Sequence, residues 1–324
     1  MHPAQVLFNG EALPRALPVC DHYCGTEVRM QKAMELQQQL GPVFDITFDC
    51  EDGAPIGKEE AHALMCAELI NSTDNLFNRI GVRIHDPMHP SLEKDIEIIV
   101  GQAGDRIAFI TIPKINSASD ALKVVELINA QAKKSGINRV IPIQVLIETH
   151  GALSECFEIA KIEQIECLSF GLMDFVSAHN GAIPSSAMST EQFSHPLIVR
   201  AMLEISAACH ANGKVPSHNV CTNINDADVI RNDCKQAKDR MGYTRKWSIH
   251  PNQIPHIVEM FSPTNAQGLE AANILCAAAD ANWGPIQFEG KLHDRASYRY
   301  YWLIIQKAIA AGQSFQNINQ RGWI

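Results

Sequence analysis

The sequence predicts a (β/α)8 barrel, an α/β fold in which eight parallel strands are each followed by a helix. Short apolar runs alternate with longer amphipathic stretches eight times within about 250 residues, a typical length for such a barrel. The runs are nearly continuously apolar, as in strands buried on both faces, whereas the stretches between them have a helical period of 3.6 residues. The glycine-rich turn of a dinucleotide-binding sheet is missing, which disfavours a doubly wound fold.

Each predicted strand is a short apolar run, and each predicted helix is a longer stretch with one apolar stripe. The helix expected at 118–135 is the clearest, because five of its apolar residues fall on one stripe: Ala121, Val124, Val125, Ile128 and Ala132. The strands are expected at 16–20, 43–49, 79–84, 107–112, 140–147, 167–171, 214–218 and 246–250. The helices are expected at 26–40, 57–71, 91–101, 118–135, 152–162, 196–212, 225–241 and 251–261.

The chain continues beyond what eight units need. We therefore divide it into a catalytic barrel domain, 1–262, and a C-terminal helical extension, 263–324, which would act as a lid or an oligomer arm. A helix is expected at 266–282, followed by a turn-forming segment at 282–292 and an aromatic-rich helix, YRYYWLIIQKAIAAG. The tail, QSFQNINQRGWI, has little core-forming pattern and is expected to be loosely packed.

Composition excludes several classes of function. The net charge is −9 and the basic residues are scattered, which argues against a nucleic-acid partner, since such binding depends on clustered Lys and Arg. No apolar run reaches the roughly 18 residues that span a bilayer, and no signal peptide is evident, so a cytoplasmic location is expected. The ten cysteines form no CxxC pair, and we interpret them as reduced core residues instead of disulfides or a zinc site.

Charged side chains or imidazoles follow nearly every predicted strand. Catalytic groups of such barrels stand at the carboxyl ends of the strands, so these residues are expected to share one mouth suited to an anionic substrate. In chain order they are Asp49, Glu51 and Asp52, Arg83 and His85, Lys114, Glu148 and His150, Asp174, His218 and His250.

Glu148 and Asp174 are the candidate metal ligands. They follow strands rich in apolar residues, where an ionised carboxylate is costly unless it is paired or coordinated. Two carboxylates on adjacent strands suit a hard cation such as Mg²⁺ or Mn²⁺. The alternative is that each carboxylate caps the next helix or pairs with Lys or Arg.

Arg83 is the candidate group for a substrate carboxylate or enolate oxygen, because its guanidinium is a rigid fork of donors. It could instead form a structural bridge to Glu51 or Asp52, and both roles are compatible. Lys114 at the end of the fourth strand is a further candidate substrate contact. For His218, substrate contact and plain packing are equally good interpretations. The histidines at the strand ends do not pair at i,i+4 as zinc-binding helices require.

These strand ends, in this order, resemble the citrate lyase β-subunit and malyl-CoA lyase group of the HpcH/HpaI aldolase superfamily. The similar segments are FDCEDGAP with GKEEA, VRIHD, IPKI, LIETHGAL, LSFGLMDF and KWSIHPNQI. The resemblance implies Mg²⁺ held by Glu148 and Asp174, Arg83 acting on substrate oxygens, and a supporting acidic pair at Glu51 and Asp52. GKLHDRAS is similar to a lid motif, which implies that Asp294 enters a neighbouring subunit's site of a trimer or hexamer.

The sequence also departs from that group in two places. The seventh strand carries Pro216, Ser217, His218 and Asn219 where an Asp-bearing segment is usual, and the first strand leads to Asp21, His22 and Tyr23 where the group has a Pro-Gly turn. An unusual insertion, 178–195, follows Asp174.

The expected activity is a reversible Claisen- or aldol-type cleavage of a malyl- or citryl-thioester-like compound to a 2-oxo acid and an acetyl unit. The expected partners are a small 2-oxo acid and an acyl-CoA or acyl carrier protein. One alternative is an aldolase of the HpaI type on free 4-hydroxy-2-oxo acids, with His85 or His150 supplying an imidazole. Another is a non-catalytic subunit that depends on a carrier protein.

Overall fold

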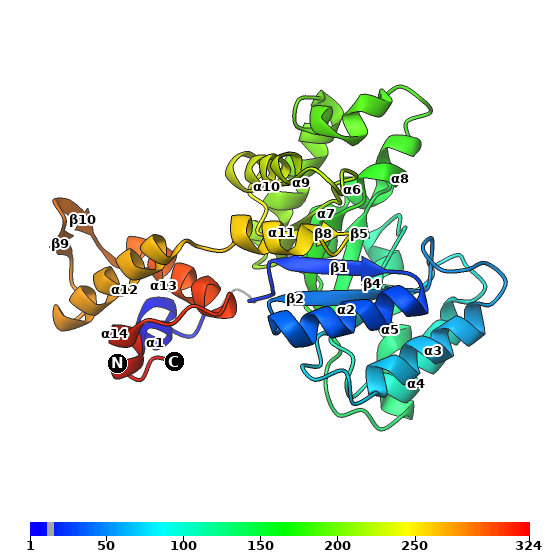
Figure 1. The fold of residues 1–324 in the computed structure, drawn as a ribbon, viewed down its shortest axis with the longest axis horizontal. Helices are drawn as coiled ribbons and strands as arrows, with labels where there is room; N and C mark the ends of the chain where they lie inside the picture. The colour runs from blue at the N-terminus through cyan, green and yellow to red at the C-terminus, as the bar shows by residue number, and fades with distance from the viewer. Residues whose placement is uncertain (12–15) are drawn as a thin grey trace.

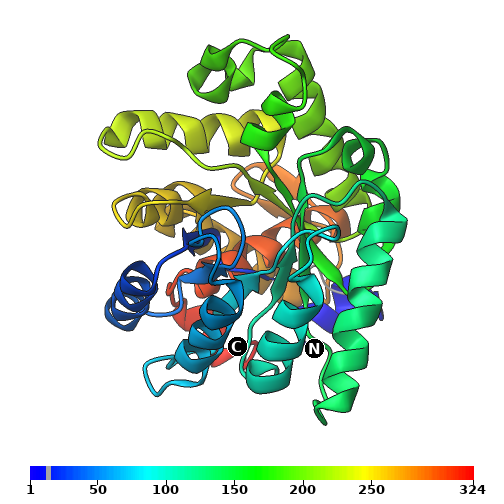
Figure 2. The same cartoon turned by 90° about the vertical axis from the view of Figure 1, so that its right-hand side faces the viewer.

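The computed structural model describes residues 1–11 and 16–324 and contains a closed barrel of eight parallel strands (Figures 1 and 2). Each strand pairs with the next, and β8 pairs with β1, so the barrel has no open edge. The predicted fold class is confirmed. The strands are β1 (Cys20–Cys24), β2 (Phe44–Asp49), β3 (Ile80–Arg83), β4 (Ile110–Ile112), β5 (Ile143–Ile147), β6 (Ile165–Phe170), β7 (Val215–His218) and β8 (Arg245–Ser248).

Helices surround the barrel close to the expected positions, with differences after β5 and β6. The helix expected at 152–162 is divided into two short helices. A short α-helix that includes Asp174 precedes the insertion 178–195, and the insertion contains two 3-10 helices, η1 (Ser185–Met188) and η2 (Thr190–Phe193). The helices are α2 (Glu27–Leu40), α3 (Glu59–Asn71), α4 (Leu92–Ala103), α5 (Ala118–Lys134), α6 (His150–Ser154), α7 (Cys156–Lys161), α8 (Leu172–Ser177), α9 (Pro196–Ala211), α10 (Ala227–Met241) and α11 (Gln253–Phe261). No helix within the described residues is both long and apolar enough to cross a membrane.

The first strand lies four residues later than the sequence pattern predicts. The apolar run 16–20 precedes it, and β1 itself contains the polar residues Asp21, His22 and Tyr23. These side chains are stabilised inside the barrel by partners on other strands. The carboxylate of Asp21, for example, lies 2.9 Å from the guanidinium of Arg245 on β8.

Arg245 is the centre of a buried ion cluster in the barrel interior. Its side chain is completely buried and pairs with Asp21 and, at 2.6 Å, with Asp45 on β2. Arg79 approaches the other oxygen of Asp45 at 2.9 Å. The interior of the barrel at this level is therefore filled by paired charges in place of branched apolar side chains.

We expect Arg245→Leu to lower the free energy of unfolding by about 3–5 kcal/mol, because it leaves two buried carboxylates without their main partner. The matched change Arg231→Leu breaks only exposed ion pairs with Asp228 and Glu259 and should cost less than about 1 kcal/mol. Urea unfolding of both variants measures the difference. Equal stabilities would show that the cluster does not hold the barrel together.

The C-terminal extension forms a second apolar core beside the barrel. It contains α12 (Asn265–Asp280), the strands β9 (Ile286–Phe288) and β10 (Lys291–His293), α13 (Arg295–Ala310) and α14 (Gln316–Gln320). Figure 1 shows it at the end of the barrel where the strands begin. Consistent with this position, Ala310 and Ala311 line a cavity together with Val19 and Val43, which precede β1 and β2.

Two expectations about the chain ends are wrong. The tail is packed, because Phe315, Ile318 and Trp323 are buried in the second core. Residues 1–11 were assigned to the barrel domain, yet α1 (Pro3–Phe8) packs its Leu7 and Phe8 into the same second core. The physical reason is that widely spaced apolar residues in polar surroundings show no period, although three-dimensional packing collects them into one cluster.

Candidate active site

A cavity of about 200 Å³ opens at the carboxyl ends of the strands. It contains side chains from or just after β1, β3, β5, β6, β7 and β8, as expected for the catalytic face of such a barrel. Its polar lining residues are Tyr23, Arg83, Glu148, Asp174, Asn219 and Trp247, and Leu146, Phe170 and Ile249 contribute apolar walls. The structure therefore brings together Arg83, Glu148 and Asp174, the three residues central to the sequence prediction.

Glu148 is held in place by its neighbours in the chain and on β4. It directly follows β5, and Thr149 caps α6 by accepting the N–H of Ala152 at 3.0 Å. Lys114 adopts a left-handed backbone conformation (φ 49°) and donates its backbone N–H to Glu148 Oε1 at 2.7 Å. The carboxyl group is 2% exposed, so its position is fixed before any ligand arrives.

Glu148 and Asp174 are a carboxylate pair that forms no ion pair with a Lys or Arg of the described residues. Burial, and after it the nearby charge of Asp174, raise the pKa of Glu148 to about 8 against the lowering effect of Arg83. Asp174, in the first turn of α8, has no hydrogen-bond or ion-pair partner among residues 1–11 and 16–324. The alternative interpretation, that each carboxylate caps a helix or pairs with Lys or Arg, finds no support in these contacts.

This donor set fits a hard divalent cation. Carboxylate oxygens, completed by water and substrate oxygens, are the ligands that Mg²⁺ and Mn²⁺ prefer. A bound cation would offset both the burial of Glu148 and its repulsion from Asp174. Glu148 and Asp174 are therefore the residues of this cavity that could hold a metal.

Gly171 makes room for the Glu148 carboxylate. A Cβ at this position would lie 2.3 Å from Glu148 Oε2 and 2.4 Å from its Cβ. We expect Gly171→Ala to push Glu148 aside and to weaken Mg²⁺ binding by about 10–100-fold, the usual effect of disturbing groups that orient a ligand. Isothermal titration with Mg²⁺ measures this. In the control, Gly101→Ala, the nearest atom lies 3.3 Å away, and this variant should bind Mg²⁺ as the wild type does.

Arg83 is held by Asp49 through a two-point contact at the mouth of the barrel. Arg83 Nε lies 2.6 Å from Asp49 Oδ1, and a terminal nitrogen lies 2.9 Å from Oδ2. The Tyr23 hydroxyl donates to Asp49 and accepts from Arg83, and the guanidinium carbon lies 4.8 Å from the centre of the Tyr23 ring. Because both carboxylate oxygens are engaged, the guanidinium plane is fixed at the cavity wall.

Glu51 and Asp52, the predicted partners of Arg83, have different roles. Glu51 Oε2 lies 3.0 Å from a terminal nitrogen of Arg83, and its other oxygen pairs with the ammonium group of Lys114. Asp52 does not contact Arg83 in the described structure and pairs instead with Lys114 at 2.9 Å. The acidic pair thus neutralises Lys114, whose pKa is raised despite partial burial because both carboxylates accept its hydrogen bonds.

Lys114, His218 and Asp294 lie outside the cavity lining. Lys114 is occupied by its two carboxylates, and only its backbone N–H reaches Glu148. His218 is completely buried, stacks on Phe193 at 5.5 Å and accepts a hydrogen bond from Lys246 at 2.9 Å. Burial and the Lys246 charge lower its pKa well below the usual value, so the ring is neutral.

Asp294 belongs to the extension, where it caps α13 by accepting the N–H groups of Ala296 and Ser297. The extension lies at the opposite end of the barrel from the mouth, so Asp294 is remote from the cavity of its own chain (Figure 1). His85 and His150 also lie outside the cavity lining. His85 pairs with Asp95 at 2.6 Å, and His150 bonds the backbone carbonyl of Ala178 at 3.1 Å.

Sequence reasoning did not assign roles to Asp49, Tyr23 and Trp247. Asp49 was noted as a strand end, and a usable signal existed, because aligning the second and third strands places it beside Arg83. Tyr23 and Trp247 stack at 5.4 Å across the β1–β8 seam that closes the barrel. Contacts across this seam join residues more than 200 positions apart, so no local pattern reveals them.

Comparison with known proteins identifies the family to which this barrel belongs. The profile of the HpcH/HpaI aldolase/citrate lyase family matches residues 41–251, which contain β2 to β8 and the Glu148, Asp174 and Arg83 positions. The chain belongs to this family.

Individual relatives are lyases or their subunits. An L-malyl-CoA/beta-methylmalyl-CoA lyase of Cereibacter sphaeroides is 30% identical over 278 residues, which cover 81% of this chain and 86% of that protein. A citrate lyase from Burkholderia xenovorans has a solved structure that is 51% identical, covers 99% of both chains and superposes with a TM-score of 0.87. The protein CitE of Mycobacterium tuberculosis, crystallised with magnesium, acetoacetate and coenzyme A, has 21% identity over 91% of this chain and 99% of its own, with a TM-score of 0.67, and shares the fold.

Proposed function

We propose that this protein is a Mg²⁺-dependent lyase that cleaves a malyl- or citryl-thioester-like 3-hydroxy-acyl compound, reversibly, into a 2-oxo acid and an acetyl thioester. The observation that carries the proposal is the pair Glu148 and Asp174, two carboxylates that form no ion pair with a cationic side chain of the described residues and that face the same cavity as a fixed arginine. Membership of the family and the malyl-CoA lyase relatives support a CoA thioester as substrate.

Different residues of the cavity have different roles in the proposed reaction. Glu148 and Asp174 hold the divalent cation, which when bound supplies Lewis-acid chemistry to the 2-oxo acid; Mn²⁺ could take the place of Mg²⁺. Arg83 stands where the guanidinium can stabilise an oxygen that gains negative charge, and Asp49 fixes its orientation beforehand. Leu146, Phe170 and Ile249 limit the access of water.

In the condensation direction, a base removes a proton from the methyl carbon of the acetyl unit. The electron pair forms an enolate, whose carbon then adds to the 2-oxo carbon, and the resulting oxyanion takes up a proton. We propose Asp294 of a neighbouring subunit as this base, since the same residue in its own chain lies at the far end of the barrel. This requires an oligomer, for which a trimer or hexamer is our proposal.

An aldolase of the HpaI type on free 4-hydroxy-2-oxo acids is the less supported function. It would need an imidazole in the cavity, whereas His85 and His150 are engaged elsewhere. The carrier-protein-dependent subunit remains a distinct second candidate, because citrate lyase relatives include β-subunit-like proteins.

An assay of malyl-CoA, citryl-CoA and 4-hydroxy-2-oxo acids with Mg²⁺ tests the proposal. Release of acetyl-CoA from a CoA ester, abolished by a chelator and restored by Mg²⁺, is the expected result. Cleavage of the free 4-hydroxy-2-oxo acids alone would favour the aldolase. Turnover that appears only after an acyl carrier protein is added would favour the dependent subunit.

The shared-site proposal is tested by mixing two inactive variants. Co-expressed Glu148→Gln and Asp294→Asn chains should recover about one quarter of wild-type activity, because random assembly pairs an intact metal site with an intact neighbouring Asp294 in that fraction of sites. The Glu148→Gln and Asp174→Asn pair is the control, since both changes affect the same chain's site. Absence of recovery in the first mixture contradicts a shared site.

A further inference from the structure

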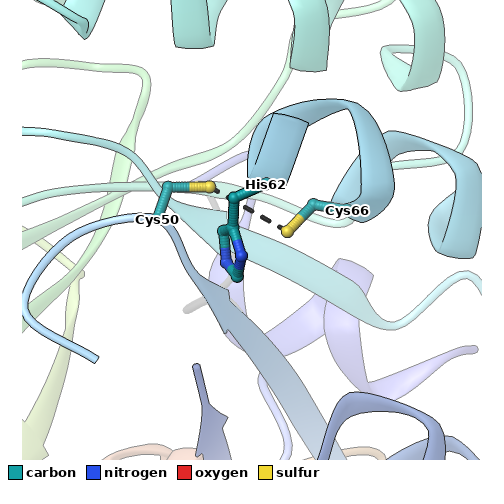
Figure 3. A group of neighbouring side chains, drawn as sticks. All are labelled: Cys50, His62 and Cys66. Atoms are coloured by element: carbon teal, nitrogen blue, oxygen red, sulfur yellow. Dashed lines mark hydrogen bonds between the residues drawn. The ribbon is translucent and has the colours of Figure 1, made fainter. Parts of the chain in front are cut away.

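Three side chains of the types that bind metals meet at the end of β2, in a place that the proposed lyase chemistry does not use. Cys50 directly follows β2, and His62 and Cys66 lie one turn apart on α3, so both helix residues face the strand end (Figure 3). Their ligand atoms all lie within 4.8 Å of one another, and all three side chains are buried.

The separation of the two sulfurs suits a shared cation. The Sγ atoms of Cys50 and Cys66 are 4.0 Å apart. Metal–sulfur bonds of about 2.3 Å in a tetrahedral shell place two sulfurs about 3.8 Å apart, so both can reach one ion with a shift of a few tenths of an ångström. Cysteine and histidine on adjacent turns of one helix, with a third ligand from a nearby strand end, is a common source of such a shell.

The imidazole of His62 is already oriented as a ligand. Its Nε2 lies 2.8 Å from the backbone carbonyl oxygen of Asp49, which can only accept, so Nε2 carries the proton in this bond. The neutral ring then keeps the electron pair on Nδ1. Metal-binding histidines almost always donate their second N–H to a carbonyl or carboxylate, which fixes the tautomer in this way.

The charge of the cluster also suits a cation. The two sulfur atoms and the imidazole lie together in one buried cluster. Two thiolates and a neutral imidazole balance the charge of Zn²⁺, and one thiolate beside a neutral thiol balances that of Cu⁺, in a buried position where an unbalanced charge is costly.

We propose that Cys50, His62 and Cys66 form a binding site for one thiophilic cation, Zn²⁺ or Cu⁺. Soft thiolate ligands select these ions over Mg²⁺, which prefers the oxygen ligands of the barrel mouth. The proposed site departs from the sequence interpretation, in which all the cysteines are reduced core residues and none belongs to a zinc site. It is independent of the lyase proposal, because it uses none of the residues that line the cavity.

Metal analysis of the untagged full-length protein tests the proposal. Protein purified without chelators should contain about one zinc or copper per chain by mass spectrometry. Zn²⁺ competition against a chromogenic chelator, and Cu⁺ competition under anaerobic reducing conditions, then identify the preferred ion, both in excess Mg²⁺. Substitution with Co²⁺ should produce a thiolate-to-metal charge-transfer band. Absence of bound metal, of competition and of this band would overturn the proposal.

Cysteine variants show whether these residues are the ligands. Cys66→Ala should lose the Co²⁺ band and stoichiometric Zn²⁺, whereas Cys209→Ala, which empties a similar buried volume on α9, should keep both. Unchanged binding in Cys66→Ala contradicts the site. If Cys66→Ala fails to fold, thiol labelling of the wild type replaces it. Zn²⁺ should then protect Cys50 and Cys66 from labelling but should not protect the half-exposed Cys276. The proposal is overturned if the metal-free protein binds no cation and Cys50 and Cys66 are recovered as a disulfide.

Discussion

Glu148→Gln is expected to lower lyase activity more than about 100-fold, since the cation's stabilisation of developing charge is worth several kcal/mol. The substitution keeps the shape of the side chain and removes its charge. Mg²⁺ binding measured by titration should fall in parallel with the rate of acetyl-CoA release. Asp174→Asn should act in the same direction, because the two carboxylates face one cavity.

The free energy of unfolding of Glu148→Gln distinguishes a loss of metal binding from misfolding. Burial raises the pKa of Glu148 from 4.5 to about 8, so in metal-free protein the folded state binds more protons than the unfolded state between these values. Stability therefore falls as pH rises through this range, and glutamine removes that loss. In a chelator at pH 8, Glu148→Gln should be at least as stable as the wild type. The exposed Glu158→Gln is the control for activity. Full turnover by Glu148→Gln without metal would contradict the proposed function.

Arg83→Lys should lower kcat by about 100- to 1000-fold, the effect of removing one donor to a developing oxyanion. Lysine keeps the charge but cannot reproduce the two-point contact with Asp49 or the fixed plane of the guanidinium. Because the lost interaction strengthens in the transition state, kcat and kcat/KM should fall together and KM should change little. Steady-state kinetics of thioester cleavage measures this.

Asp49→Asn tests whether orientation matters apart from charge. It leaves Arg83 in place with a weaker clamp, so its kcat should lie between those of Arg83→Lys and the wild type. Arg299→Lys is the matched control, since Arg299 also forms a two-point pair, with Glu11, in the remote extension. A wild-type kcat for Arg83→Lys would remove Arg83 from the reaction.

The site residues that lie at the ends of their own strands were predictable from the sequence. Glu148, Asp174 and Arg83 follow apolar runs in the sequence, and parallel strands of a barrel necessarily end at the same face. The partners of these residues were less predictable. Asp49 ends the second strand and Asp52 follows it, but only Asp49 lies in register with Arg83, and the register depends on how the two strands pair.

The sequence by itself determined the barrel, because the alternation of buried strands and amphipathic helices is a local pattern that hydrophobic burial imposes on the chain. It also placed three of the residues that line the mouth. Only the tertiary structure decided that the polar segment at 20–24 is the first strand, since its Asp21 and Tyr23 are stabilised by Arg245 and Arg83 on distant strands. Cys50, His62 and Cys66 likewise meet only through the packing of α3 on the end of β2. Electrostatic and coordinating contacts act through space and not along the chain, so such groupings follow from the fold and leave no periodic trace in the sequence.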